Sequence, residues 1–178
     1  MSSADCVAIG VLSLISYADK DKWIMIEKQR WAKLFNIPMA DKTPEPFPQP
    51  TINTQRALCV IEADYPDKLG DCFAALYKAF WEERQTIGKV DVIGPVLAKV
   101  LGEAETKKVM DKIGSPEAKK ALKDNSDLSM AEGAFGLPWW VATNVKGEKE
   151  AFWGFDHLGQ VIDHLGLERS EQGLRAML

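Results

Sequence analysis

The stretch Gly133–Gly166, GAFGLPWWVATNVKGEKEAFWGFDHLGQVIDHLG, carries the pattern on which the fold depends. Trp139–Val145 is rich in aromatic and β-branched residues, which predicts a strand, and Lys146–Glu148 supplies a turn. Glu150–Phe155 predicts the returning strand. From His157 the apolar residues recur at the i, i+3, i+4, i+7 spacing of a helix that packs one face. The stretch therefore predicts a β-hairpin followed by a helix.

Helical patterns fill most of the chain before this stretch. Trp23–Asn36 shows apolar residues at helical spacing, and Ile37-Pro38 ends that helix. The proline-rich Thr43–Pro50 predicts a connector, with the edge of a lid as the alternative. Thr51 or Asn53 caps the next helix. Three later segments also predict helices: one that starts at Pro66 with an apolar stripe through Trp81, then Val92–Leu101 and Glu103–Ile113. Ser115-Pro116 is a cap followed by a first-turn proline, which begins another helix.

The first residues predict one more element of a sheet. Val7–Ile15 is continuously apolar but only nine residues long, far below the ~20 residues of a membrane span. It favours a buried strand, with a short buried helix as the alternative. One strand from the start and a hairpin from the end most economically form one sheet, with helices inserted between them. The expected class is α/β, with a discontinuous sheet subdomain at 1–19 and 127–178 and a helical lobe at 20–126.

Composition narrows the functional classes. The net charge is −4 and the 22 basic residues are scattered, which argues against a nucleic-acid partner. We expect no membrane attachment.

Three widely spaced cysteines without a CxxC motif favour a reducing compartment. A cytoplasmic location is expected, with mitochondrial and peroxisomal locations left open. His157 and His164 lie seven residues apart without a third ligand, so no metal is expected.

Two polar features of the stretch suggest a ligand site. Pro138 sits at the first residue of a strand, where its missing N–H costs the sheet least. A cis bond after Leu137 would turn the Leu137 backbone outward to pair with an extended peptide-like ligand; the alternative is a plain edge proline. Asp156 would cap the last helix. Its second carboxylate oxygen would also be free to bind a ligand's ammonium.

The motif GAFGLPWW…FWGFDHLG resembles the C-terminal half of kappa-class glutathione transferases, which group with 2-hydroxychromene-2-carboxylate isomerases in the DsbA-like thioredoxin fold. The segments KDKWIMIEKQRWAKLFNIPM (Lys20–Met39), NTQRAL (Asn53–Leu58) and AALYKAFW (Ala74–Trp81) also resemble that family. The resemblance covers about Lys20 to Leu167. It implies a glutathione-dependent transferase or isomerase that acts on a small hydrophobic electrophile, with glutathione as cosubstrate and a homodimer as the assembly.

The resemblance also implies roles for single residues. Pro138 would be the cis-proline, and Leu137 would pair its backbone with the cysteinyl part of glutathione. Asp156 would hold the γ-glutamyl ammonium. Phe155 stands where a small polar residue is usual, and His157 where a basic residue is common. Lys20 falls near a lysine that reaches the glycine carboxylate.

One departure from the family pattern affects the catalytic group. The family begins with a strand, a Ser-Pro-Tyr-Ser loop, a helix and a second strand, and the loop serine stabilises the glutathione thiolate. Nineteen residues precede Lys20, and they lack that motif. Ser16 and Tyr17 are the candidate replacements. The expected fold is therefore an incomplete DsbA-like thioredoxin fold with a large helical insertion.

Two alternatives to the glutathione-dependent enzyme stay open. The first is a glutathione-independent isomerase or cyclase, with a pocket between sheet and helical lobe lined by Trp23, Trp139, Trp140 and Phe155. Its acid–base residue would be His157, Asp156 or Tyr17. The second is a catalytically inactive truncated protein that binds a partner.

Overall fold

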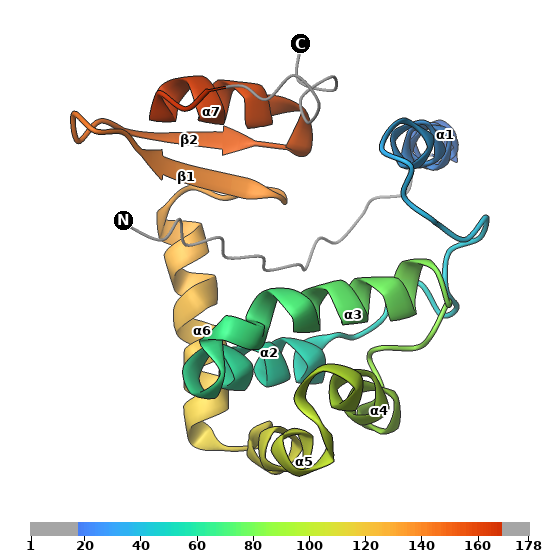
Figure 1. Ribbon diagram of the computed structural model, residues 1–178. Coiled ribbons are helices and arrows are strands. Elements are labelled where there is room, and N and C mark those ends of the chain that lie inside the picture. The colour runs from blue at the N-terminus through green and yellow to red at the C-terminus, as the bar shows by residue number, and fades with distance from the viewer. Residues whose placement is uncertain (1–17, 169–178) are drawn as a thin grey trace. The chain divides into compact units, whose positions relative to one another are not determined.

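The computed structural model describes residues 18–168, with side chains from residue 22 onward. In this part of the chain the elements are α1 (Ala18–Leu34), α2 (Ile52–Asp64), α3 (Leu69–Trp81), α4 (Val90–Leu101), α5 (Glu103–Lys112), α6 (Pro116–Ala131), β1 (Trp139–Thr143), β2 (Lys149–Trp153) and α7 (Leu158–Leu165) (Figure 1). The predicted order of helices followed by ββα is confirmed. The predicted strand Val7–Ile15 lies outside the described residues.

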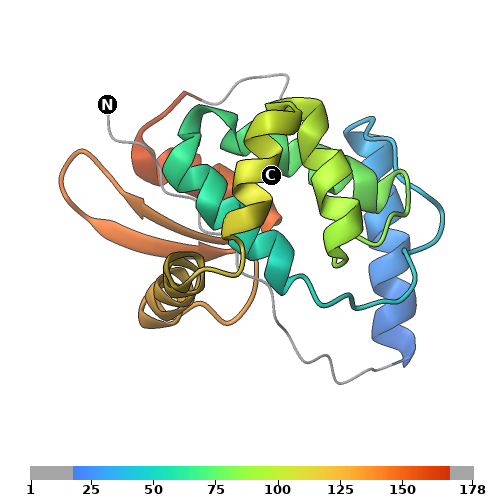
Figure 2. The same cartoon turned by 90° about the horizontal axis from the view of Figure 1, so that it is seen from below.

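The described chain divides into two compact units, residues 18–122 and residues 123–168, and the division falls within α6. In the first unit α3 packs on α4, α4 on α5, and α2 on α5 (Figure 2). Their apolar faces enclose a core whose largest fully buried side chains include Ile61, Ile93, Leu97 and Val109. Burial of such side chains contributes roughly 1.5–3 kcal/mol each relative to exposure. Apolar residues read from the sequence on α2 to α5 therefore form a packed core, whereas those of α1, such as Trp23 and Ile26, stay exposed.

Two helices of this unit were predicted to begin with a capping side chain, and the structure supports one of the two predictions. The Ser115 hydroxyl accepts a hydrogen bond from the Ala118 N–H at 3.1 Å, so the predicted cap of α6 is confirmed. Thr51 precedes α2 but makes no side-chain capping bond, and the prediction of a capping side chain there is wrong for Thr51. Its ψ of 15° departs from the extended conformation that aims a capping hydroxyl at the helix.

Polar and cationic contacts attach α1 to the same unit. The Lys28 ammonium lies 5.3 Å from the centre of a Trp81 ring, and the Ala40 N–H donates to the Trp81 carbonyl at 2.8 Å. Burial lowers the pKa of Lys28, and the nearby Asp41 carboxylate opposes that shift. A cation over an indole face is attractive because the ring face is electron-rich. Trp81 therefore anchors both α1 and the loop that follows it.

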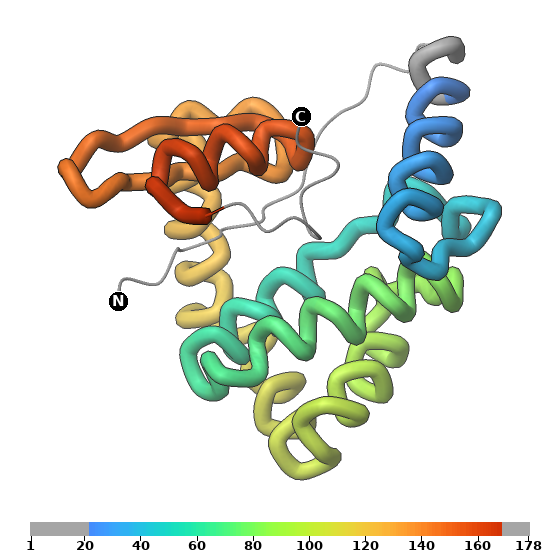
Figure 3. The backbone as a smooth tube through the Cα atoms, turned by 45° about the horizontal axis from the view of Figure 1, so that its top comes forward, coloured from blue at the N-terminus to red at the C-terminus, as the bar shows by residue number. Residues whose placement is uncertain are grey.

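In the unit of residues 123–168, the end of α6 is followed by an antiparallel hairpin with α7 on one face (Figure 3). The register pairs Trp139 with Trp153 and Trp140 with Phe152. Because side chains alternate between the faces of a strand, these two pairs lie on opposite faces. The second strand ends at Trp153 rather than at the predicted Phe155, because Gly154 has a φ of 93° and turns the chain out of the sheet.

Within residues 18–168, every helix is too short or too polar to span a lipid bilayer.

Candidate ligand-binding site

Gly154 links the two halves of the candidate site. Its N–H donates to the Pro138 carbonyl at 2.9 Å, and its own carbonyl accepts a hydrogen bond from the Trp140 indole N–H at 3.2 Å. The Leu137–Pro138 peptide bond, at the entrance of β1, is cis. These bonds tie the turn after β2 to the residue that opens β1. The strand entrance and the start of α7 are therefore fixed to each other.

Leu137 keeps an unpaired peptide group at this entrance. Among residues 18–168, no hydrogen bond involves its N–H or its carbonyl. The residue as a whole is half-buried. Backbone polar groups in such positions usually find a partner. An extended ligand with its own peptide group would supply one.

Asp156 occupies the middle of a short 3-10 turn, Phe155–His157, that separates β2 from α7. Its Oδ1 lies 2.4 Å from the point that a Cβ on Gly154 would occupy, so the carboxylate folds back over the glycine. The prediction that Asp156 caps the last helix is wrong: His157 holds that position, and neither helical start has a side-chain capping bond. The reason is the 3-10 turn Phe155–His157, because it places Asp156 one residue before the position that caps α7.

The carboxylate of Asp156 is open to solvent, with 66% of its side chain exposed. Its contact among the described side chains is the His157 ring, whose Nδ1 lies 3.5 Å from Oδ1. That nitrogen is itself buried and makes no hydrogen bond. Asp156 therefore presents a carboxylate with unused acceptor capacity next to an imidazole. An ammonium group is the ligand chemistry that suits it.

An aromatic cluster covers the hairpin face opposite α7. Phe135 lies 5.1 Å from the Trp139 ring and 5.0 Å from the Trp153 ring. Gly136 permits this packing, since a Cβ there would stand 2.5 Å from Trp153 Nε1. Phe135 and Trp153 are both exposed, and the Trp139 indole N–H is buried without a partner. The cluster flanks Leu137 in sequence on both sides.

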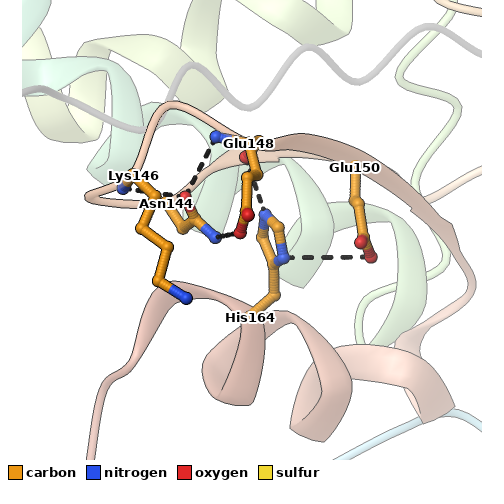
Figure 4. A network of polar contacts seen from close by, with 5 residues as sticks. All are labelled: Asn144, Lys146, Glu148, Glu150 and His164. Atoms are coloured by element: carbon orange, nitrogen blue, oxygen red, sulfur yellow. Dashed lines mark hydrogen bonds and ion pairs between the residues drawn. The ribbon is translucent and has the colours of Figure 1, made fainter.

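A polar network at the hairpin turn fixes α7 on the other face (Figure 4). Asn144 Oδ1 accepts from the N–H groups of Lys146 and Glu148 at 2.9 and 3.0 Å. His164 Nε2 lies 3.0 Å from the Glu148 carbonyl, and its Nδ1 lies 3.8 Å from the Glu150 carboxylate. The ring also lies against Phe152, at 5.8 Å between centres. His164 thus anchors the end of α7, while the candidate site lies at its beginning.

The other predicted site residues fall in different parts of the chain. Ser16 and Tyr17 lie outside the described residues. Lys20 lies in the first turn of α1, in the unit of residues 18–122, as does Trp23. Trp139, Trp140 and Phe155 belong to residues 123–168. The structure thus brings together Leu137, Pro138, Trp139, Phe155, Asp156 and His157 in one unit, around Gly154.

Sequence reasoning missed Gly154, Phe135 and Trp153 as parts of this site. A signal was present for the first, because glycine directly after a strand often marks a turn. The two aromatic residues looked like ordinary strand or core residues, and only the hairpin register brings Trp153 opposite Trp139.

Residues 8–166 match the family described as the DSBA-like thioredoxin domain. The chain belongs to this family. The α/β class and the DsbA-like thioredoxin fold with a helical insertion, both expected from the sequence, are therefore confirmed.

Curated relatives connect the chain to kappa-class glutathione transferases. It is 26% identical to glutathione S-transferase kappa 1 of Rattus norvegicus over 151 residues, which cover 83% of this chain and 66% of that protein. It is 28% identical to glutathione S-transferase kappa 2 of Caenorhabditis elegans over 153 residues, which cover 84% and 65%. The chain thus spans about two thirds of the length of these relatives.

A solved structure shares the fold. The cytosolic disulfide reductase DsbM from Pseudomonas aeruginosa superposes with a TM-score of 0.58 at 16% identity, covering 86% of this chain and 77% of that one.

Proposed function

We propose that this chain binds glutathione and acts as a kappa-like glutathione transferase or glutathione-dependent isomerase on a small hydrophobic electrophile. One observation carries the proposal: an unpaired peptide group at Leu137 and an exposed carboxylate at Asp156 are tied together through the Gly154–Pro138 hydrogen bond. The similarity to kappa-class glutathione transferases supports it.

The residues present fit the charges and peptide groups of glutathione. Its cysteinyl peptide group would pair with the Leu137 N–H and carbonyl, and its γ-glutamyl ammonium would bind Asp156. The Pro138 carbonyl already accepts from Gly154, so Pro138 would contribute shape rather than a hydrogen bond. Phe155 would offer an apolar contact, and a role for Lys20, which lies in the other unit, stays a prediction from the resemblance.

The proposed reaction is attack of the glutathione thiolate on an electrophilic carbon. A new S–C bond forms, and in a transfer the leaving group departs with its electron pair. The thiol proton must first pass to a base or to water, and a hydrogen-bond donor near the sulfur favours the thiolate. Ser16 and Tyr17 stay the predicted donors.

The aromatic cluster of Phe135, Trp139 and Trp153, in which Phe135 and Trp153 are exposed, supports the choice of a hydrophobic electrophile. Aromatic rings supply a large apolar surface and favour stacked or edge-on contacts with other rings. The opposite face of the hairpin is covered by α7. The aromatic face is therefore the part of this unit where an apolar substituent on sulfur would gain most.

Calorimetric titration with glutathione, together with retention on immobilised glutathione, tests the proposal. We expect saturable binding of one glutathione per chain, and turnover of an aryl halide that depends on glutathione. Absence of binding by both methods would overturn the proposal. Conversion of a hydrophobic compound without glutathione would instead support the glutathione-independent enzyme.

We also propose a symmetric homodimer in the cytoplasm. Trp23 and Ile26 on α1 are more than half exposed, and large exposed apolar side chains often belong to interfaces. Light scattering at micromolar concentration should give twice the chain mass, whereas a stable monomer would contradict the dimer.

A further inference from the structure

The unit of residues 18–122 carries an open groove between α1 and the loop that follows it. The groove encloses about 450 Å³, and its lining residues are Met25, Ile26, Gln29, Arg30, Lys33 and Asp41. Its surface is largely apolar, because long polar side chains cover it with their alkyl stems. Ligand sites in proteins commonly combine such an apolar surface with a few polar groups.

Contacts on both sides hold the walls of this groove in place. The Met25 Sδ accepts a hydrogen bond from the Thr43 hydroxyl at 3.7 Å. The Ala40 N–H, next to Asp41, donates to the Trp81 carbonyl at 2.8 Å, and the Lys28 ammonium lies over the Trp81 ring. The helix and the loop are therefore fixed to the same unit, and the groove is a feature of that unit alone.

The charges along the groove leave one cation unbalanced. Arg30 is paired with Glu27, which lies one turn earlier on α1, and Asp41 lies close enough to Lys28 for their charges to interact. Among residues 22–168, Lys33 makes no ion pair with another side chain. It is exposed at the end of the helix. The groove therefore favours a ligand with one negative charge.

The order of the lining residues along α1 gives the ligand a direction. Met25, Gln29 and Lys33 follow one another at a spacing of four residues, so they lie along one face of the helix. They span about 12 Å, at 1.5 Å per residue. The groove thus passes from an apolar end at Met25, through an amide, to a cation at Lys33.

We propose that this groove binds a small linear carboxylate, a short- to medium-chain fatty acid. Its hydrocarbon tail lies along Met25 and Ile26, and its carboxylate accepts hydrogen bonds from the Lys33 ammonium and the Gln29 amide. This site is separate from the candidate glutathione site, which belongs to residues 123–168.

Calorimetric titration of the full chain with three probes, in the absence of glutathione, tests the proposal. Octanoate carries both the tail and the charge, 1-octanol the tail alone, and acetate the charge alone. We expect one octanoate per chain, bound roughly fivefold more tightly than 1-octanol, because an exposed ion pair adds only modestly to the apolar contact. Acetate should show no measurable binding.

Variants of Lys33 test the charged end of the groove. Lys33→Met keeps the length of the side chain but removes the charge, so octanoate and 1-octanol should bind about equally. Lys33→Arg should keep the preference for octanoate. Lys99→Met is the matched control, because Lys99 is likewise an exposed lysine in the last turn of a helix. It should behave like the wild type.

Met25→Ala tests the apolar end. It should weaken octanoate and 1-octanol by a similar factor, with a thermal melt to confirm that the variant is folded. Three results would each overturn this inference: no octanoate binding by the wild type, acetate binding as tight as octanoate binding, or a preference for octanoate that persists in Lys33→Met. Because these titrations contain no glutathione, their outcome leaves the proposed function unaffected.

Discussion

The Gly154 N–H donates to the Pro138 carbonyl at 2.9 Å, so one hydrogen bond joins the strand entrance to the turn that carries Asp156. Gly154 has a φ of 93°, a conformation that glycine adopts far more easily than other residues. Gly154 therefore has two roles: it sets the direction of the chain after β2, and its missing side chain leaves room for the Asp156 carboxylate.

Gly154→Ala should separate these two roles when compared with Gly147→Ala. Both glycines have positive φ, but a Cβ at Gly147 meets open space, whereas one at Gly154 meets the Asp156 carboxylate. Each variant should lose about 1–2 kcal/mol of unfolding free energy from backbone strain. Only Gly154→Ala should weaken glutathione binding, because its Cβ displaces the carboxylate. Urea unfolding and calorimetry measure the two effects, and equal dissociation constants for the two variants would argue against the site.

Gly136→Ala should destabilise the hairpin by overpacking. The new Cβ would stand 2.5 Å from Trp153 Nε1 and 3.0 Å from its Cε2, and overpacking of this kind costs about 1–3 kcal/mol. Trp153→Ala removes those atoms, so Gly136→Ala should cost less in the Trp153→Ala background than in the wild type. If the losses of unfolding free energy were additive in a double-mutant cycle of urea unfolding, the two residues would not be in steric contact.

Asn144→Ala should weaken the hairpin turn. The Asn144 side chain accepts two backbone hydrogen bonds, from Lys146 and Glu148, and donates to the Glu148 carboxylate at 2.6 Å. Loss of these bonds should cost about 1–2 kcal/mol. The neighbouring Val145→Ala is the control, since Val145 is almost fully exposed and should change little. Similar urea midpoints for both variants would contradict a structural role for Asn144.

Cys59 and Cys72 should be unreactive in the folded chain. Both are buried, and burial raises the pKa of the Cys72 thiol, with Asp71 adding to the shift. A raised pKa leaves little thiolate near neutral pH, and the thiolate is the reactive form. Iodoacetamide followed by mass spectrometry should label neither cysteine until a denaturant is added. Rapid labelling of Cys72 would favour thiol–disulfide chemistry over the proposed reaction.

The local sequence pattern predicts most of the helices and strands, whereas the features that it does not predict depend on tertiary contacts. The apolar spacing of α3 and α4 and the cap at Ser115 depend on neighbours in sequence, so they were readable in advance. The hairpin register was not. A turn centred on Gly147 would pair Trp139 with Phe155. Instead, the Asn144 side chain accepts hydrogen bonds within a longer loop, and the strands align so that Trp139 pairs with Trp153.

The candidate site shows the same limit. Residue type and position in the sequence alone predict Leu137, Pro138 and Asp156 as site residues. The role of Asp156 was misjudged because the φ of Gly154 inserts a 3-10 turn before α7. A conformation that one glycine permits is not visible in hydrophobic periodicity, although it decides where the carboxylate lies.

The central claim is that the Asp156 carboxylate binds the ammonium of glutathione. Asparagine keeps the size of the side chain but removes its charge, and Asp156 makes no capping bond that the change would break. Asp163→Asn, on the body of α7, is the matched control. The control should bind like the wild type, and the melting temperatures of the wild type and Asp156→Asn should be nearly equal.

The most direct measurement is therefore the glutathione dissociation constant of Asp156→Asn relative to the wild type, by calorimetry at one pH. Loss of a charge-assisted hydrogen bond worth about 1.5–3 kcal/mol predicts a constant roughly ten- to a hundredfold larger. A wild-type chain that binds glutathione together with an Asp156→Asn variant that binds it equally well would contradict the account.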